Sequence, residues 1–164
     1  MIKEITILII LFLSATILDA QPPQPPRPIA VFVNPAQGLI FGTFFRGNTG
    51  GSVIIYPDGS RSVTGDIVQS NIGVPFSPAI FEVEASQGTI ITILNGPDIK
   101  LNGSNGGTVN LHIGTASSGS PFITSVSYPS RTTIRVGGTL SVGGPLTSPS
   151  GSYSGVFYVT FIHQ

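Results

Sequence analysis

The sequence predicts an all-β fold, an antiparallel β-sandwich of about 8–10 short strands. Short runs rich in Val, Ile, Thr and aromatic residues recur about every 8–12 residues, and turn residues separate them. No apolar spacing of helical period occurs. The outward positions carry Thr, Ser, Glu and Arg, which argues against the continuous apolar band of a membrane barrel.

The N-terminus has the order of a secretory signal peptide. Lys3 precedes an apolar run over residues 5–13, and small residues lead up to Ala20. The run is shorter than the about 20 apolar residues that span a bilayer. We therefore expect cleavage of residues 1–20, no membrane span afterwards, and an exported protein that is periplasmic, at the cell surface or extracellular. An uncleaved anchor is the alternative, which Asp19 and the following prolines disfavour.

The composition of the mature chain excludes several classes of function. Removing residues 1–20 leaves 144 of 164 residues, enough for one domain with its own core. The charged side chains in this part, six basic and five acidic, are scattered and offer no patch for nucleic acid. The absence of cysteine excludes disulfides, thiolate metal sites and thiol catalysis. We expect residues 29–164 to form a single β-sandwich domain of bacterial origin.

A proline-rich segment precedes this domain. Residues 21–28 read Gln-Pro-Pro-Gln-Pro-Pro-Arg-Pro, and the five prolines lack the backbone donors that a helix or a sheet requires. We interpret the segment as an extended spacer, with a docking motif for a partner as the alternative.

Strand signals follow along the domain. A tight turn with the sequence Pro-Asp-Gly-Ser at residues 57–60 predicts a hairpin. The clearest half-buried strand, residues 79–85, places Glu82 and Glu84 on its polar face. We expect strands over residues 29–34, 39–45, 52–56, 61–68, 79–85, 89–94, 99–101, 108–113, 132–136, 139–142 and 151–164.

Two features of the C-terminal third shape the predicted topology. Gly137 and Gly138 separate two strand signals and indicate a hairpin turn. Residues 151–164 form the longest strand signal and carry apolar side chains on both faces. A strand of this kind is expected in the middle of a sheet, with neighbours that cover it.

The sequence offers few groups for catalysis or metal binding. His112 and His163 are the only histidines, and they lie on separate predicted strands without further ligands at metal-site spacing. Residues 151–155 read Gly-Ser-Tyr-Ser-Gly and lack the central serine of a nucleophile elbow. Glu82 and Glu84 would suit sugar hydrolysis or calcium, but no third acidic residue is adjacent, so we interpret them as a solvated strand face. We predict no enzyme, no cofactor and no metal.

The loops hold one suggestive feature. Residues 102–107 and 115–120 are dominated by Asn, Gly, Ser and Thr, and Phe122 follows the second loop. Loops of this composition on a rigid sandwich can bind carbohydrate or protein. Asn102-Gly103-Ser104 matches the glycosylation sequon, which we interpret as an ordinary loop in a bacterial chain.

Five segments in order carry a family resemblance: Leu-Ile-Phe-Gly-Thr-Phe at 39–44, Gly-Gly-Ser-Val-Ile-Ile-Tyr-Pro-Asp-Gly-Ser-Arg at 50–61, Phe-Glu-Val-Glu at 81–84, Val-Gly-Gly-Thr-Leu-Ser-Val-Gly at 136–143, and Gly-Ser-Tyr-Ser-Gly-Val-Phe-Tyr-Val-Thr at 151–160. From about Ala30 onward the chain resembles DUF4402, an uncharacterised bacterial secreted family. The resemblance implies an exported immunoglobulin-like β-sandwich without known catalysis. By looser similarity it implies kinship with spore coat protein U and fimbrial subunit domains. The proline stub and the Ile162-His163-Gln164 end depart from the family pattern.

These observations favour a structural or interaction module, such as a fimbria-like or surface-assembly subunit. Its partner would be another copy of the chain or another exported β-domain, joined through sheet edges. The alternative is a carbohydrate- or protein-binding module that uses the polar loops. A degradative enzyme is disfavoured by the few charged side chains.

Overall fold

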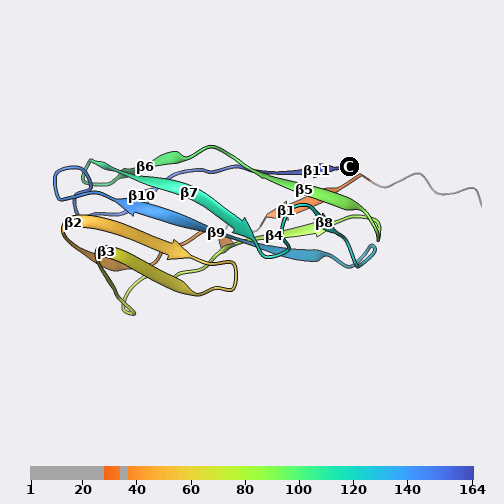
Figure 1. Cartoon of the computed structure of the whole chain (residues 1–164), viewed down its shortest axis with the longest axis horizontal. Coiled ribbons are helices and arrows are strands. Elements are labelled where there is room, and N and C mark those ends of the chain that lie inside the picture. Colours follow the sequence, from red (N-terminus) through yellow and green to blue (C-terminus); the bar gives the residue numbers. More distant parts are fainter. Residues whose placement is uncertain (1–27, 34–36) are drawn as a thin grey trace, which may run out of the picture.

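The computed structural model describes residues 28–33 and 37–164, and within them it contains eleven strands and no α-helix. An antiparallel eight-stranded sheet and an antiparallel three-stranded sheet confirm the predicted all-β sandwich (Figure 1). The predicted signal peptide and residues 21–27 of the proline stub lie outside the described residues. The strands are β1 Ala30–Val33, β2 Phe44–Ile55, β3 Arg61–Gln69, β4 Ala79–Glu84, β5 Ile90–Asn95, β6 Ile99–Gly103, β7 Thr108–Ala116, β8 Phe122–Ile123, β9 Thr132–Val142, β10 Tyr153–Ser154 and β11 Val159–His163.

Strand β9 is the central element of the eight-stranded sheet. Along one side, its first half pairs with β4 and its second half pairs with β2, while β7 lies along the other side. Beyond these strands the sheet continues to β1 past β4, to β3 past β2, and to β6 and β10 past β7. Because β4 and β2 follow one another along β9, the molecule is elongated in the direction of this strand (Figure 1).

The hairpin predicted at Gly137 and Gly138 is wrong, because β9 runs through both residues without a turn. A Cβ atom on Gly137 would lie 2.3 Å from the Ile55 carbonyl oxygen, and one on Gly138 would lie 2.7 Å from Leu39 Cδ2. The two glycines stand where the neighbour of β9 changes from β4 to β2. They therefore permit close packing of strands rather than a reversal of the chain.

The β2–β3 hairpin confirms the turn predicted at residues 57–60. Its Tyr56 amide donates to the Ser60 carbonyl, and Asp58 accepts hydrogen bonds from the Ser60 amide and hydroxyl at 2.8 and 2.6 Å. The strand predicted at residues 39–45 begins only at Phe44, since Gly42 has a φ of 73° that interrupts the extended chain.

Strand β2 also differs from the prediction at its middle, because it continues through residues 50 and 51, where the sequence suggested a break. Its register against β3 shifts between Arg46 and Gly51. This bulge accommodates the glycines inside one long strand.

The single central strand predicted for residues 151–164 is wrong. The segment forms β10, an outer strand of the large sheet, and β11, an outer strand of the small sheet with the order β11-β5-β8. The intervening residues pass from one sheet to the other, and a Cβ on Gly155 would lie 2.6 Å from Leu101 Cδ2. Apolar residues on both faces were therefore no sign of a central position.

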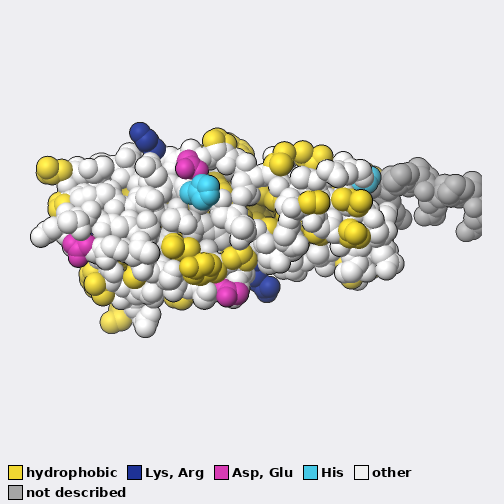
Figure 2. All heavy atoms as spheres, in the orientation of Figure 1, with side chains coloured by type: hydrophobic (Ala, Val, Ile, Leu, Met, Phe, Trp, Pro, Cys, Tyr) yellow, Lys and Arg dark blue, Asp and Glu magenta, His cyan; other side chains and the backbone are white. Residues whose placement is uncertain are grey.

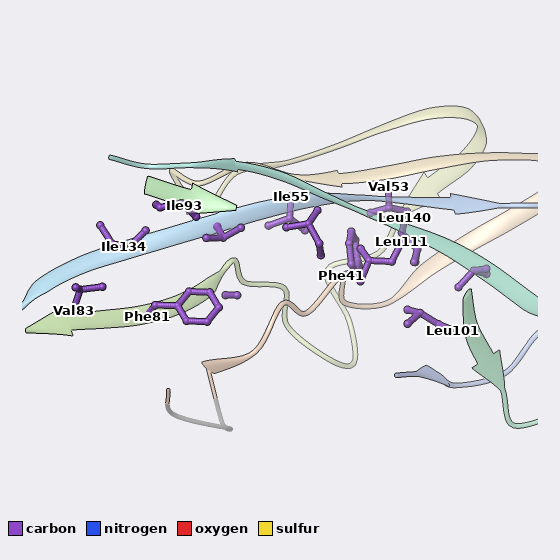
Figure 3. Close-up of a cluster of buried hydrophobic side chains, with 14 of the residues drawn as sticks. Phe41, Val53, Ile55, Phe81, Val83, Ile93, Leu101, Leu111, Ile134 and Leu140 are labelled. Carbon is purple, nitrogen blue, oxygen red and sulfur yellow. The ribbon is translucent and has the colours of Figure 1, made fainter. Parts of the chain in front are cut away.

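One hydrophobic core lies between the layers (Figure 3). The inward side of β4 is buried as predicted, with Phe81 and Val83 exposed by 7% and 0%. Ile134 and Val136 of β9 are completely buried. The three-stranded sheet covers this end of the core with Ile91, Ile93 and Phe122, which are also buried.

Candidate functional site

Strand β1 ends one side of the large sheet, and its inward side chains are only partly covered. It pairs with β4 alone, with Val31 opposite Val83 and Val33 opposite Phe81. Side chains of directly opposed residues lie on the same face of a sheet, so both valines point toward the core side. Nevertheless Val31 is 39% and Val33 is 58% exposed. An apolar surface that belongs to the interior is thus open to solvent.

The position of β11 explains this exposure. The rings of Phe161 in β11 and Phe81 in β4 lie 5.5 Å apart, which places β11 over β4. The connection from β7 to β8 runs on the opposite side, where Ser117 and Arg135 exchange hydrogen bonds. The small sheet therefore packs over β4, and among the described residues no extensive contact joins its strands to β1. The large sheet extends one strand further than the small one.

We call this step the ledge, formed by the free edges of β1 and β11 and by the apolar side chains Val31, Val33, Val159 and Phe161. Val159 and Phe161 are partly buried against the core. Neither strand contains Lys, Arg, Asp, Glu or Pro. Charges and prolines are the usual devices that keep a free sheet edge from pairing with another chain. Among the described residues, the ledge thus combines unpaired backbone groups with the exposed side chains of Val31 and Val33.

The outer face of the three-stranded sheet next to the ledge is also apolar and uncharged. Ile90 of β5 lies opposite Ile123 of β8, and these side chains are 41% and 66% exposed. Leu94 and Ile162 add further exposed surface on the same face. Figure 2 shows apolar side chains gathered over this end of the molecule.

Glu82 and Glu84 lie on the outer face of β4, as predicted, but they are not free carboxylates. Arg131 Nη1 lies 2.9 Å from Glu82 Oε2, and Arg131 Nε lies 3.6 Å from Glu84 Oε2. The hydrogen bond to Glu82 raises the pKa of Arg131. The same guanidinium stacks 3.7 Å from the centre of the Phe32 ring in β1. Arg131 thus binds β1 to β4, a role the sequence could not reveal because 49 residues separate it from Glu82.

The two histidines do not come together. His112 on β7 forms a pair with Asp98, with 2.7 Å between Nδ1 and Oδ1, whereas His163 lies on β11. In the described part of the chain, no three His, Cys, Asp or Glu side chains form a group that could hold a metal ion. The Asp98 pairing was missed from the sequence, although Asp98 directly precedes β6, which pairs with β7.

The polar loops differ from each other. Residues 102 and 103 belong to β6, and Asn102 is opposite Thr108 and Ser154 in the ladder, so part of the sequon lies in a strand. Within residues 115–120, Thr115, Ala116, Gly119 and Ser120 line a hollow of about 370 Å³ between β5 and β7. Phe122, which the sequence placed near this loop surface, is buried in the core.

The Gly-Ser-Tyr-Ser-Gly segment at residues 151–155 forms β10 and its flanks. The Tyr153 hydroxyl donates a hydrogen bond to the Pro149 carbonyl oxygen. A Cβ on Gly151 would lie 2.8 Å from Ser104 Oγ. Gly151 therefore stands where a neighbouring segment approaches too closely for a larger side chain.

A family model described as "Domain of unknown function (DUF4402)" matches residues 31–162. The chain belongs to the DUF4402 family. The match covers β1 to β11 almost completely, so both edges of the ledge lie within the DUF4402 domain. No curated protein and no solved structure shows a significant match to the chain. The looser similarity to spore coat protein U and fimbrial subunit domains stays a prediction.

Proposed function

We propose that this DUF4402 protein is an exported, non-catalytic interaction module that assembles through the ledge, as a fimbria-like or surface-assembly subunit. The observation that carries the proposal is the exposure of Val31 and Val33, whose side chains point toward the core side and are nevertheless 39% and 58% exposed. The signal-peptide pattern of residues 1–20 supports export. The partner is a second copy of the chain or another exported β-domain.

The ledge favours an extended segment as its occupant. A strand beside β11 would bond to the free backbone groups of that edge and would lie over β1, with every second side chain against the two valines. Each new ladder hydrogen bond contributes about 0.5–1.5 kcal/mol, and each buried CH₂ group about 0.8 kcal/mol. A charged side chain at an inward position would oppose this gain, so the occupant alternates apolar side chains without inward charges.

Light scattering of residues 21–164 over a range of concentrations tests the proposal. We expect concentration-dependent assembly that is lost in Thr160→Lys, which places a charge on the β11 edge. Thr64→Lys is the matched control, because Thr64 is an exposed residue of β3, another free edge. Each substitution should change the free energy of unfolding by less than about 0.5 kcal/mol.

A second experiment tests assembly with a different protein. A peptide with the sequence of residues 29–33, Ile-Ala-Val-Phe-Val, is a suitable probe, because it has strand-forming residues and all five of its side chains are apolar and uncharged. We expect it to slow hydrogen exchange of amides at the β11 edge. A chain that stays monomeric at every concentration, with β11 amides unaffected by the peptide, would contradict assembly through the ledge.

A further inference from the structure

The hollow between β5 and β7 has an apolar floor and a polar rim. Ile93 and Ile113 form part of its lining and are 7% and 2% exposed. Asn95, His112 and Thr115 supply polar groups around them. Its volume of about 370 Å³ lies within the range of small-molecule sites. The hollow lies on the side of β5 that faces β8 and the β7–β8 connection, whereas β11 of the ledge pairs along the other side of β5, with Val159 opposite Asn95 and Phe161 opposite Ile93. A ligand in the hollow goes beyond the proposed assembly function, because it would use neither free edge of the ledge.

Asn95 presents a carbonyl oxygen at a fixed position. Its amide nitrogen donates to the carbonyl oxygens of Ile113 at 3.2 Å and Gly114 at 2.8 Å. These two bonds use both amide hydrogens and set the orientation of the group. The Asn95 side-chain oxygen accepts no hydrogen bond from another described residue, so it is available to a ligand that donates.

His112 presents a second acceptor on the same rim. Its Nδ1 lies 2.7 Å from Asp98 Oδ1, and an ionised carboxylate can only accept, so Nδ1 carries the hydrogen. In the neutral ring, Nε2 then accepts a hydrogen bond. Figure 2 shows a histidine beside an acidic side chain near the middle of the displayed face. The Thr115 hydroxyl, which bonds to no other described residue, can donate or accept.

The charges around the hollow restrict the class of ligand. Its lining contains no Lys or Arg that would bind an anion, and the Asp98 carboxylate pairs with His112 of the lining. Two fixed acceptors and one hydroxyl suit a ligand with several hydroxyl donors, and the apolar floor suits its C–H surface. We propose that the hollow binds a neutral saccharide unit through its hydroxyl groups.

Nuclear magnetic resonance titration of residues 21–164 with methyl glycosides of glucose, galactose, mannose and N-acetylglucosamine tests this site. At least one neutral glycoside is expected to shift amide signals of residues 93–95 and 112–120 with an affinity in the millimolar range. Methyl glucuronide, which adds a carboxylate to the glucose framework, is expected to bind more weakly. No shift with any neutral glycoside, or a preference for the glucuronide, would overturn the proposal.

A pair of variants locates the binding. His112→Ala removes one acceptor from the rim and is expected to weaken binding about 3- to 10-fold. His163→Ala is the matched control, because it changes the other histidine, on β11, and is expected to leave the affinity unchanged. Since His112 and Asp98 have side chains about two-thirds exposed (66% and 67%), the substitution should preserve the fold. Equal affinity in both variants would overturn the assignment of the saccharide to this hollow.

Discussion

The large sheet ends very differently at β3 and at β1. In β3, the guanidinium of its first residue, Arg61, donates to the carbonyl oxygens of Phe41, Thr43 and Ser70 at 3.1, 3.2 and 2.8 Å and so holds the adjoining loops against the sheet. The β3 edge also carries the charged Asp66 beside a bulge. Strand β1 carries no charge and exposes Val31 and Val33 on its core side, whereas the exposed Val68 of β3 follows the buried Ile67 and so lies on the outer face. Free edges within one sheet can thus be protected or left accessible, and the accessible edge at β1 is the candidate interaction surface.

The largest expected effect concerns the β3 edge, where Arg61→Ala should lower the free energy of unfolding by about 3 kcal/mol. The substitution leaves carbonyl oxygens without donors and removes the guanidinium that stacks 4.3 Å from the centre of the Phe76 ring. Burial lowers the pKa of Arg61, but the guanidinium remains charged at neutral pH. Urea unfolding measures the loss, and Arg46→Ala is the control, since among the described residues the Arg46 side chain donates a hydrogen bond only to the neighbouring Gly47 carbonyl. Equal losses in both variants would contradict the role given to Arg61.

A slightly smaller effect is expected at Gly137, where β2 packs against β9. Gly137→Ala would place a methyl group 2.3 Å from the Ile55 carbonyl oxygen and should cost about 2 kcal/mol by forcing β2 away from β9. Gly144→Ala is a milder control, because its new Cβ would lie 3.1 Å from the Asn48 carbonyl oxygen. If urea unfolding shows no difference between the two, close packing at Gly137 is not required.

At the β1 edge, Arg131→Gln should weaken the attachment of β1 to β4 while leaving the rest of the fold intact. It removes the ion pairs with Glu82 and Glu84 and the stacking on Phe32. We expect hydrogen exchange of the β1 amides to become several-fold faster. The control is Arg135→Gln, an exposed arginine of β9, and unchanged β1 exchange in Arg131→Gln would show that strand pairing alone holds β1.

The pH dependence of this attachment follows from the sign of the pKa change. Bonding to Glu82 raises the pKa of Arg131, so its stabilising contribution is complete below the ordinary arginine pKa. The contribution is lost only as the pH rises through the folded value. Hydrogen exchange should therefore show no loss of β1 protection through deprotonation of Arg131 near neutral pH.

The smallest effect is expected at the β2–β3 turn. Hydrogen bonds from the Ser60 hydroxyl and amide lower the pKa of Asp58 below its ordinary 3.8. The resulting stabilisation is present above 3.8 and disappears as the pH falls through the folded value. Nuclear magnetic resonance titration should give a midpoint below 3.8 for Asp58, and Ser60→Ala should move it back toward 3.8. An identical midpoint in both proteins would contradict the hydroxyl as the main cause.

Local signals in the sequence were sufficient for the all-β class, the hairpin turn at residues 57–60 and the buried face of residues 79–85. These features depend on backbone preferences and on side-chain alternation within a few residues, which a sequence displays directly. The DUF4402 resemblance, carried by segments in a fixed order, was also readable from the chain alone and is confirmed by the family match over residues 31–162.

Tertiary structure decided which strands lie at the edges and which distant residues meet. Residues 151–164 have the pattern of a central strand, yet they divide between two sheets, and Gly137 and Gly138 fit a turn as well as a tight strand junction. The contacts of Arg131 with Glu82 and of Phe161 with Phe81 join residues far apart in the chain. Alternation specifies which side chains share a face, but only the packing of the sheets determines whether another strand covers that face.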